Sequence, residues 1–225
     1  FMRKRTVVLT VHDCRIMERK NGLSKIIAKW LYLKLPIWKS QFVTANSEIT
    51  KQDVIKYTNC NPDKITVIPV AIDDIYQPFP KTFNQDKPNI LHIGTGENKN
   101  LLRLIEAIQG INCHLSIVGK LREEQKQCLV KYRIEYSNDY SISQNEMLQK
   151  YKECDILDFV STFEGFGMPI IEANSVERVV LTSNISSMPE VAGDAALLVN
   201  PFNVEEIRKG IIELRDNQSL RKQLI

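Results

Sequence analysis

The chain has 225 residues, of which 43% are hydrophobic and 25% are charged, as is ordinary for a soluble globular protein. Its formal charge of +3 is too small to argue for nucleic acid as a partner, and no block of lysine and arginine resembles a binding arm. No stretch reaches the roughly 18 apolar residues of a membrane span, and five scattered cysteines without C-x-x-C spacing indicate reduced thiols in a cytoplasmic protein.

The first third of the chain alternates strand-like and helix-like segments. His12 follows directly on the first strand, and Ser47 suits the N-cap of a helix. The expected elements are a strand at 6–11, a helix at 24–35, a strand at 41–45, a helix at 47–57 and a strand at 64–70. These are fewer elements than a full α/β domain contains, so we expect part of the domain to lie ahead of Phe1.

The segment from Ser24 to Lys39 is basic and amphipathic, with four lysines among apolar residues that include Trp30 and Trp38. A helix that packs its apolar stripe into the core and leaves its lysines in water is the commoner explanation. The alternative is peripheral contact of Ser24–Lys39 with an anionic membrane. We favour the first interpretation and keep the second open.

Between residues 73 and 88 the composition shifts to proline, asparagine and other polar residues, which predicts a linker. We therefore divide the chain into a partial N-terminal domain with linker at 1–83 and a C-terminal domain at 84–225. Strands are expected in the second domain at 89–93, 114–118, 156–160, 179–182 and 196–199, and helices at 101–109, 123–133, 144–152, 168–175 and 204–215. This alternation predicts an α/β fold with a doubly wound parallel sheet.

In such sheets ligands bind outside the carboxyl ends of the strands, and glycines follow three of the predicted strands there. The most informative run, from Ser161 to Ala173, places two glycines and then Pro169 at a predicted helix start. Free N–H groups of the first helical turn favour a phosphate. Glu164 and Glu172 frame this site, and because carboxylates repel phosphate they suit sugar or ribose hydroxyls better.

The run Glu-Gly-Phe-Gly-Met-Pro, with a second glutamate eight positions after Glu164, resembles the E-x7-E signature of retaining GT-B glycosyltransferases, especially glycosyltransferase family 4. Residues 182–196 continue this resemblance, residues 93–100 resemble the glycine-and-lysine loop that begins the donor domain, and residues 11–13 and 68–73 match stretches of the preceding domain. The resemblance implies a GT-B fold, with a Rossmann-like C-terminal domain and, in this chain, a partial Rossmann-like N-terminal domain.

The resemblance also implies roles for particular residues. Glu164, His12 and Lys99 would be the catalytic residues, with Lys99 also holding the donor's diphosphate. The implied donor-binding residues are Gly94, Gly96, Lys99, Glu164, Gly165, Phe166, Gly167, Met168 and Glu172. The base is expected near 119–121 and 138–141. Many relatives carry an arginine where this chain has Asn98 or Thr95, which predicts weaker or differently arranged phosphate binding.

Each of these roles has a structural alternative. Lys99 is also typical of a solvated first-turn lysine, and Glu172 of an acid that interacts with a helix dipole. His12 would then be a hydrogen-bonded core histidine, and for Phe166 and Met168 core packing is the commoner expectation. His92 and His114 have no motif around them and are expected to be structural.

The implied reaction is retaining transfer of a mannosyl- or glucosyl-like group from a GDP- or UDP-linked sugar to a glycan or lipid-linked acceptor. It would need no metal and no cofactor beyond the sugar nucleotide, which is a co-substrate. A second hypothesis is a nucleotide-sugar-binding or interaction module, or a fragment, that does not catalyse transfer. A nucleotide-sugar epimerase or a phosphorylase would share the fold, but the Glu164 motif and the chain length argue against them.

Overall fold

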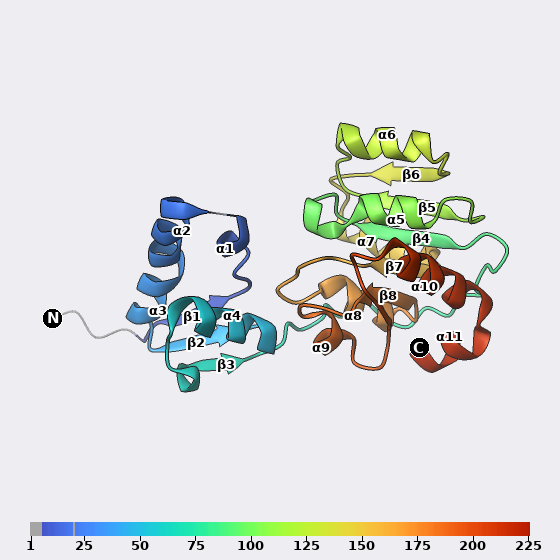
Figure 1. The fold of residues 1–225 in the computed structure, drawn as a ribbon. Helices are drawn as coiled ribbons and strands as arrows, with labels where there is room; N and C mark the ends of the chain where they lie inside the picture. The colour runs from blue at the N-terminus through green and yellow to red at the C-terminus, as the bar shows by residue number, and fades with distance from the viewer. Residues whose placement is uncertain (1–5, 20) are drawn as a thin grey trace. The chain divides into compact units, whose positions relative to one another are not determined.

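The computed structural model describes residues 6–19 and 21–225, and it divides the chain into two compact units (Figure 1). The first unit comprises residues up to Ala71 together with Glu164–Phe166, and the second comprises Ile72–Phe163 and Gly167–Ile225. The sequence places the domain boundary at residue 83, whereas the contacts assign residues 72–83 to the second unit. Each unit has a parallel sheet and a hydrophobic core of its own.

The first unit is built on a parallel sheet in the order β1-β2-β3. Its central strand buries Val43 and Ala45 completely, against Met17, Leu33 and Val54 from the helices. The elements are β1 (Val8–Val11), α1 (Ile16–Arg19), α2 (Gly22–Ala28), η1 (Lys29–Lys34), α3 (Leu35–Lys39), β2 (Phe42–Ala45), α4 (Glu48–Thr58), η2 (Pro62–Lys64) and β3 (Ile65–Val67).

Helices α2, η1 and α3 follow one another without a break, and η1 is a π-helical turn. The buried residues of this stretch are Ala28, Leu33 and Ile37. Our favoured interpretation of Ser24–Lys39, an apolar stripe packed into the core, is therefore wrong for much of it. Trp30 and Trp38, together with the apolar residues Leu23, Ile26, Ile27 and Leu31, are exposed.

The segment predicted as a linker is fastened to the second unit. Tyr76 is buried and packs edge-on against Tyr151, with ring centroids 5.7 Å apart. The buried Asp155 carboxylate accepts the backbone N–H groups of Asn84 at 3.1 Å and Asn89 at 2.8 Å, and it also pairs with Lys81. The prolines and polar residues that predict a linker therefore belong to an ordered segment that packs against the second unit.

The second unit has a parallel sheet in the order β6-β5-β4-β7-β8-β9, in which β4 lies beside both β5 and β7 (Figure 1). This is the Rossmann order, with its switch point between β4 and β7. The elements are β4 (Asn89–Ile93), η3 (Glu97–Lys99), α5 (Leu101–Ala107), β5 (His114–Val118), α6 (Glu123–Lys131), β6 (Tyr136–Asp139), α7 (Gln144–Glu153), β7 (Ile156–Phe159), α8 (Met168–Ser175), β8 (Val179–Ser183), α9 (Met188–Ala192), β9 (Leu197–Val199), α10 (Val204–Asp216) and α11 (Gln218–Leu224).

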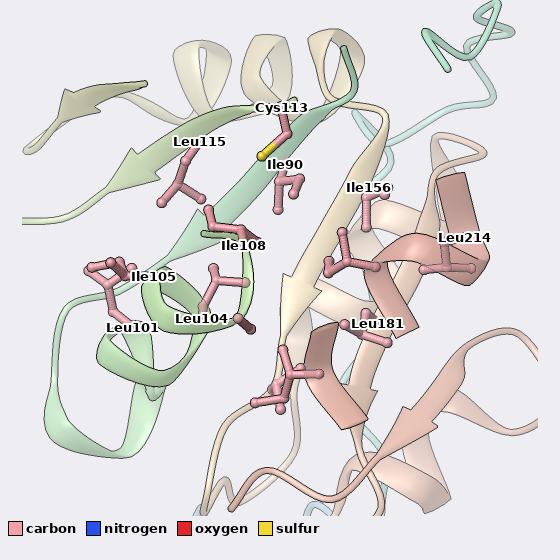
Figure 2. Close-up of a cluster of buried hydrophobic side chains, with 14 of the residues drawn as sticks. Ile90, Leu101, Leu104, Ile105, Ile108, Cys113, Leu115, Ile156, Leu181 and Leu214 are labelled. Carbon is pink, nitrogen blue, oxygen red and sulfur yellow. The ribbon is translucent and has the colours of Figure 1, made fainter. Parts of the chain in front are cut away.

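Alternate residues of the central strands enter two cores, one on each face of the sheet. Ile90 and Ile156 pack with Leu104 of α5 and Ile211 of α10, whereas Leu91 and Leu157 pack with residues of α7, α8 and α9. Figure 2 shows the first of these cores, with side chains of α5 directed at the strands. The predicted doubly wound parallel sheet is confirmed. Among the described residues, no helix is both long and apolar enough to cross a membrane.

Candidate functional site

Lys99 and Gly94 fit together at the carboxyl end of β4. Gly94 has φ +93°, and a Cβ there would lie 2.9 Å from Lys99 Cγ and 3.0 Å from Lys99 Cε. Glycine is therefore needed twice, for its backbone conformation and for the space that the lysine stem occupies. The Lys99 ammonium lies 4.5 Å from the centroid of the Phe159 ring, at the end of β7. The lysine thus spans the switch point of the sheet.

Two asparagines hold the loop after β4 to the segment after β7. Asn98 Nδ2 donates to Phe163 O at 3.0 Å, and the Thr162 amide donates to Asn98 O at 2.8 Å. Asn100 Nδ2 donates to Val160 O at 3.1 Å and to Pro201 O at 2.7 Å. Asn98 therefore has a structural role that the sequence did not reveal.

Thr95 connects the loop after β4 to the loop after β5. Its Oγ1 donates to Lys120 O at 2.7 Å, and its own carbonyl accepts from Nε2 of the buried Gln125 at 3.0 Å. Gly119 has φ +145°, and a Cβ there would lie 2.9 Å from Thr95 Cγ2. Gly96 only precedes η3, with an ordinary φ of −65°. The two loops thus form one rigid platform.

Glu172 lies about one turn into α8, where a tyrosine holds its carboxylate. Tyr151 is fully buried, and its hydroxyl donates to Glu172 Oε2 at 2.5 Å. Burial raises the pKa of Glu172, whereas hydrogen bonds from Tyr151 and Tyr76 lower it. Burial and the nearby Glu172 charge raise the pKa of Tyr76 to about 12, so this phenol stays a donor at neutral pH. Neither tyrosine was predicted as part of the site. Tyr151 has the helical spacing of a core residue, and Tyr76 lies in the segment predicted as a linker.

A cavity of about 440 Å³ opens beside Glu172. It is lined by the ends of β4 and β5, residues 141–144, α7, the start of α8 and Tyr76. Gly119 and Ser141, from the two loops predicted to hold a base, both face it. Met168, for which core packing was the commoner expectation, lines the cavity as well.

Helix α8 begins next to this cavity without a capping side chain. Gly167 is its N-cap, with φ +119°, and Pro169 stands in the first turn. A Cβ at Gly167 would lie 3.2 Å from Ile170 Cδ1, so a larger residue would disturb this turn. The start of the helix therefore offers backbone N–H groups and the positive end of its dipole to an anion.

The remaining predicted site residues belong to the first unit. The Gly165 carbonyl accepts the hydroxyls of Ser47 at 2.7 Å and Thr50 at 3.1 Å. A Cβ at Gly165 would lie 2.0 Å from His12 O, so only glycine fits. His12 is exposed, and Glu164 and Phe166 are half-buried within this unit. Gly94, Gly96, Lys99, Gly167, Met168 and Glu172 lie in the second unit.

The two other histidines have structural partners, as expected. His92 Nδ1 lies 2.8 Å from Asp158 Oδ2, and both side chains are buried between β4 and β7. His114 Nε2 lies 3.0 Å from Ser137 Oγ. In the described part of the chain, no group of three or more His, Cys, Asp and Glu side chains is arranged to hold a metal ion.

The fold is that of solved GT-B glycosyltransferases. The crystal structure of Anabaena Alr3699/HepE in complex with UDP and glucose superposes with a TM-score of 0.83 at 16% identity, over 98% of this chain and 65% of that one. WaaG, a glycosyltransferase involved in lipopolysaccharide biosynthesis, superposes with a TM-score of 0.75 at 16% identity, over 95% of this chain and 67% of that one. The predicted fold class is confirmed.

The chain belongs to the family Glycosyl transferases group 1, whose model matches residues 74–225. The model of Glycosyltransferase Family 4 matches residues 1–75, which confirms the resemblance derived from the motifs.

Three similar proteins are bacterial. The serotype-specific mannosyltransferase WbdA of Escherichia coli is 24% identical over 83% of this chain and 26% of its own length. The Campylobacter jejuni N-acetylgalactosamine-N,N'-diacetylbacillosaminyl-diphospho-undecaprenol 4-alpha-N-acetylgalactosaminyltransferase is 26% identical over 95% of this chain and 62% of its own length. The O-antigen chain mannosyltransferase RfbU of Salmonella typhimurium is 28% identical over 88% of this chain and 57% of its own length. The chain thus spans between a quarter and about three fifths of the lengths of these relatives.

Proposed function

We propose that this chain carries the donor site of a retaining glycosyltransferase that transfers a hexosyl group from a nucleotide diphosphate sugar. One observation carries the proposal: the cavity at the carboxyl ends of β4 and β5 contains the tyrosine-held Glu172 and adjoins the start of α8. A nucleoside in this cavity would place its ribose hydroxyls on Glu172 and its diphosphate towards the helix N-terminus.

Lys99 gives the proposed site its cation. Its ammonium lies over the Phe159 ring at the end of β7, on a stem fixed by Gly94. Charge develops on the departing nucleoside diphosphate during transfer, and a fixed ammonium together with the α8 amides would stabilise it without reorganisation. We propose that Glu164 and the backbone of Gly165 to Gly167 contact the donor sugar, and that His12 faces it.

The sugar and the acceptor rest on the similar proteins. WbdA and RfbU are named mannosyltransferases, which favours a mannosyl group carried by GDP or UDP. The name of the Campylobacter jejuni protein includes a diphospho-undecaprenol, so we propose a glycan acceptor that is free or carried on a lipid. In the second case the protein would work at the surface of a membrane, as the alternative interpretation of Ser24–Lys39 requires.

The first test is the melting temperature with UDP, GDP and ADP in turn, in the presence of a chelator. A ligand at 100 times its Kd adds about 2.7 kcal/mol, which is roughly 5–10 °C for a chain of this size. We expect one nucleotide alone to stabilise the second unit, and the shift to shrink in Glu172→Gln. If no nucleotide shifts the transition of a folded sample, the donor-site proposal is refuted for this chain.

Catalysis needs a separate measurement, because Asn98 and Thr95 leave open a module that only binds. The resemblance leads us to expect an arginine near these positions, and both residues are used instead in loop hydrogen bonds. We expect transfer from the stabilising sugar nucleotide to survive a chelator and to be lost in Glu164→Gln, with nucleotide binding retained. Nucleotide binding without transfer would favour the binding module. Unchanged turnover in Glu164→Gln would refute the proposed catalytic role of Glu164.

A further inference from the structure

A second cavity, of about 430 Å³, lies at the edge of the second unit's sheet where the strands begin. Its walls come from residues 81–85 ahead of β4, 154–155 ahead of β7 and 177–179 at the start of β8, and from α11 with Ile225. The donor site lies at the carboxyl ends of the strands, and the two cavities share no lining residue. A volume of this size suits a small organic ligand.

The lining of this second cavity is positively charged. It carries four basic side chains and two acidic ones, and the positive excess remains when the α-carboxyl of Ile225 is counted. One of the acids, Asp155, is already compensated, because it pairs with Lys81 and accepts two backbone N–H groups. Glu177 is the other acid in the lining, and it stands against three further cations. The second cavity therefore attracts anions.

Arg178 contributes a buried charge to this lining. It is 3% exposed, and its guanidinium donates to backbone carbonyls that include those of Tyr151 at 3.0 Å, Phe79 at 2.9 Å and Lys152 at 2.7 Å. Carbonyl groups hold the side chain in place without cancelling its charge. Within the described chain, neither Arg178 nor Arg221 forms an ion pair with a carboxylate. Burial lowers the pKa of both guanidinium groups by more than nearby acids raise it, and a bound anion would relieve this.

Arg221 is anchored on one side only. It is 7% exposed, and its Nη1 donates to Leu214 O at 2.7 Å and Arg215 O at 2.6 Å. The Phe83 ring centroid lies 4.0 Å from its Cζ, so the plane of the guanidinium is fixed. Among the described residues, nothing accepts a hydrogen bond from its Nε or Nη2, and solvent reaches both nitrogens. Arg221 therefore presents a fixed pair of donors, which is the arrangement that binds an oxyanion through two parallel hydrogen bonds.

The rest of the lining indicates what kind of anion fits. Gln218 and Lys222 lie three positions before and one position after Arg221 on the helix, so Gln218 shares a face with both basic residues. Phe83 and Val179 supply apolar walls. A phosphate monoester carries nearly two charges, two oxygens for Arg221, a third for Lys222, and an organic body for the apolar walls. A carboxylate would satisfy Arg221 but would leave the remaining positive charge uncompensated.

We propose that the second cavity binds a phosphate monoester, held by the Nε–Nη2 edge of Arg221 and by the ammonium of Lys222. The inference goes beyond the proposed transfer reaction, and it uses no residue of the donor site. Failure of one therefore leaves the other standing. Binding at the second cavity is measured without any sugar nucleotide present.

Nuclear magnetic resonance of the full chain, labelled with ¹⁵N, reports directly on Arg221. The Nε–H signal of Arg221 is identified by its loss in Arg221→Lys, and the probes are phenyl phosphate, inorganic phosphate and phenol. We expect phenyl phosphate to shift this signal at lower concentration than inorganic phosphate does, and phenol to leave it unchanged. No shift at millimolar phenyl phosphate would overturn the proposal. Equal affinity for inorganic phosphate would overturn the role of the apolar walls, and an equal shift with phenol would overturn the role of the phosphate.

A pair of glutamine variants on α11 separates the second cavity from the overall charge of the helix. Gln218→Glu adds a carboxylate to the lining and should weaken phenyl phosphate binding about fivefold or more. Folding should tolerate this change, because Gln218 is exposed and the first turn of a helix favours an acid. The matched control is Gln223→Glu, an exposed position of α11 outside the lining, which should bind as the parent does. Equal losses in both variants would show that the charge of α11, not the second cavity, is responsible.

Two further variants locate the ligand by calorimetric titration with phenyl phosphate. Arg221→Lys keeps the charge but removes the paired donors, and it should weaken binding about 10-fold or more. Lys99→Ala, in the donor site, should bind phenyl phosphate as the parent does. Loss of binding in Lys99→Ala would place the ligand in the donor site and contradict the proposal. Circular dichroism and the melting transition check folding, and if Arg221→Lys does not fold, the comparison of Gln218→Glu with Gln223→Glu decides.

Discussion

The hydrogen bond from Tyr151 to Glu172 offers the sharpest test of the second unit. Replacing Tyr151 by phenylalanine keeps the buried ring and its contact with Tyr76, and it removes only the hydroxyl that donates at 2.5 Å. A hydrogen bond to a charged group contributes about 1.5–3 kcal/mol. We expect Tyr151→Phe to lower the free energy of unfolding by that amount near pH 7.5, because Tyr76 remains as a donor to Glu172.

The pH dependence of this loss follows from the titration of Glu172. Burial raises the pKa of its carboxyl above 4.5, so the folded state keeps this proton to a higher pH than the unfolded state does. Glu172 therefore makes folding less favourable as the pH rises from 4.5 through its folded pKa. Removing the Tyr151 hydroxyl raises that pKa further. The cost of Tyr151→Phe should be largest above the folded pKa of the variant and should have fallen to a smaller, constant value below the folded pKa of the parent.

Urea unfolding followed by circular dichroism measures this cost, because both tryptophans lie in the first unit and tryptophan fluorescence would miss the second. Tyr140→Phe, which changes an exposed tyrosine, is the matched control and should stay within about 0.5 kcal/mol of the parent. In a double-mutant cycle, Tyr151→Phe should cost less on a Glu172→Gln background. A cost that does not vary with pH, or that is equal on both backgrounds, would refute the reasoning.

Three further predictions concern single residues. Lys99→Ala should weaken binding of a nucleoside diphosphate about 10-fold or more while leaving the nucleoside unaffected in calorimetric titration, and equal losses would point away from the phosphates. Gly94→Ala should lower the melting temperature and cost at least about 1 kcal/mol, because φ is +93° and Lys99 fills the space; an unchanged melting temperature would contradict this. Asp158→Ala should cost about 1–3 kcal/mol in urea unfolding, because it leaves the buried His92 Nδ1 without its partner; a loss under about 0.5 kcal/mol would show that the pair is dispensable.

The sequence was sufficient for five of the six strands of the second unit, because these strands are mostly apolar and glycines follow three of them. It was insufficient for β6, whose residues Tyr136 to Asp139 are mostly polar and form an edge strand. The π-helical turn was equally hidden, since residues 29–34 have ordinary helix-forming composition. The extra residue moves the buried position after Ala28 from Tyr32 to Leu33, and Tyr32 is exposed.

The candidate site shows the same division. Positions that need glycine, such as Gly94 and Gly167, could be predicted because few other residues adopt their backbone conformations. The partners of Glu172 could not, because Tyr151 lies 21 residues away on another helix and Tyr76 lies in a segment that resembles a linker. Long-range contacts of this kind leave no local pattern in a sequence.

The asparagine bonds of the loop after β4 have a consequence for the order of folding. Asn98 bonds a residue 65 positions later, and Asn100 bonds residues 60 and 101 positions later. Closing such long loops costs conformational entropy before the hydrogen bonds can form, so we do not expect these bonds to form early in the folding of the unit. A chain still leaving the ribosome cannot complete them until Pro201 has emerged. We therefore expect the sheet to form first and the ligand platform to be finished last.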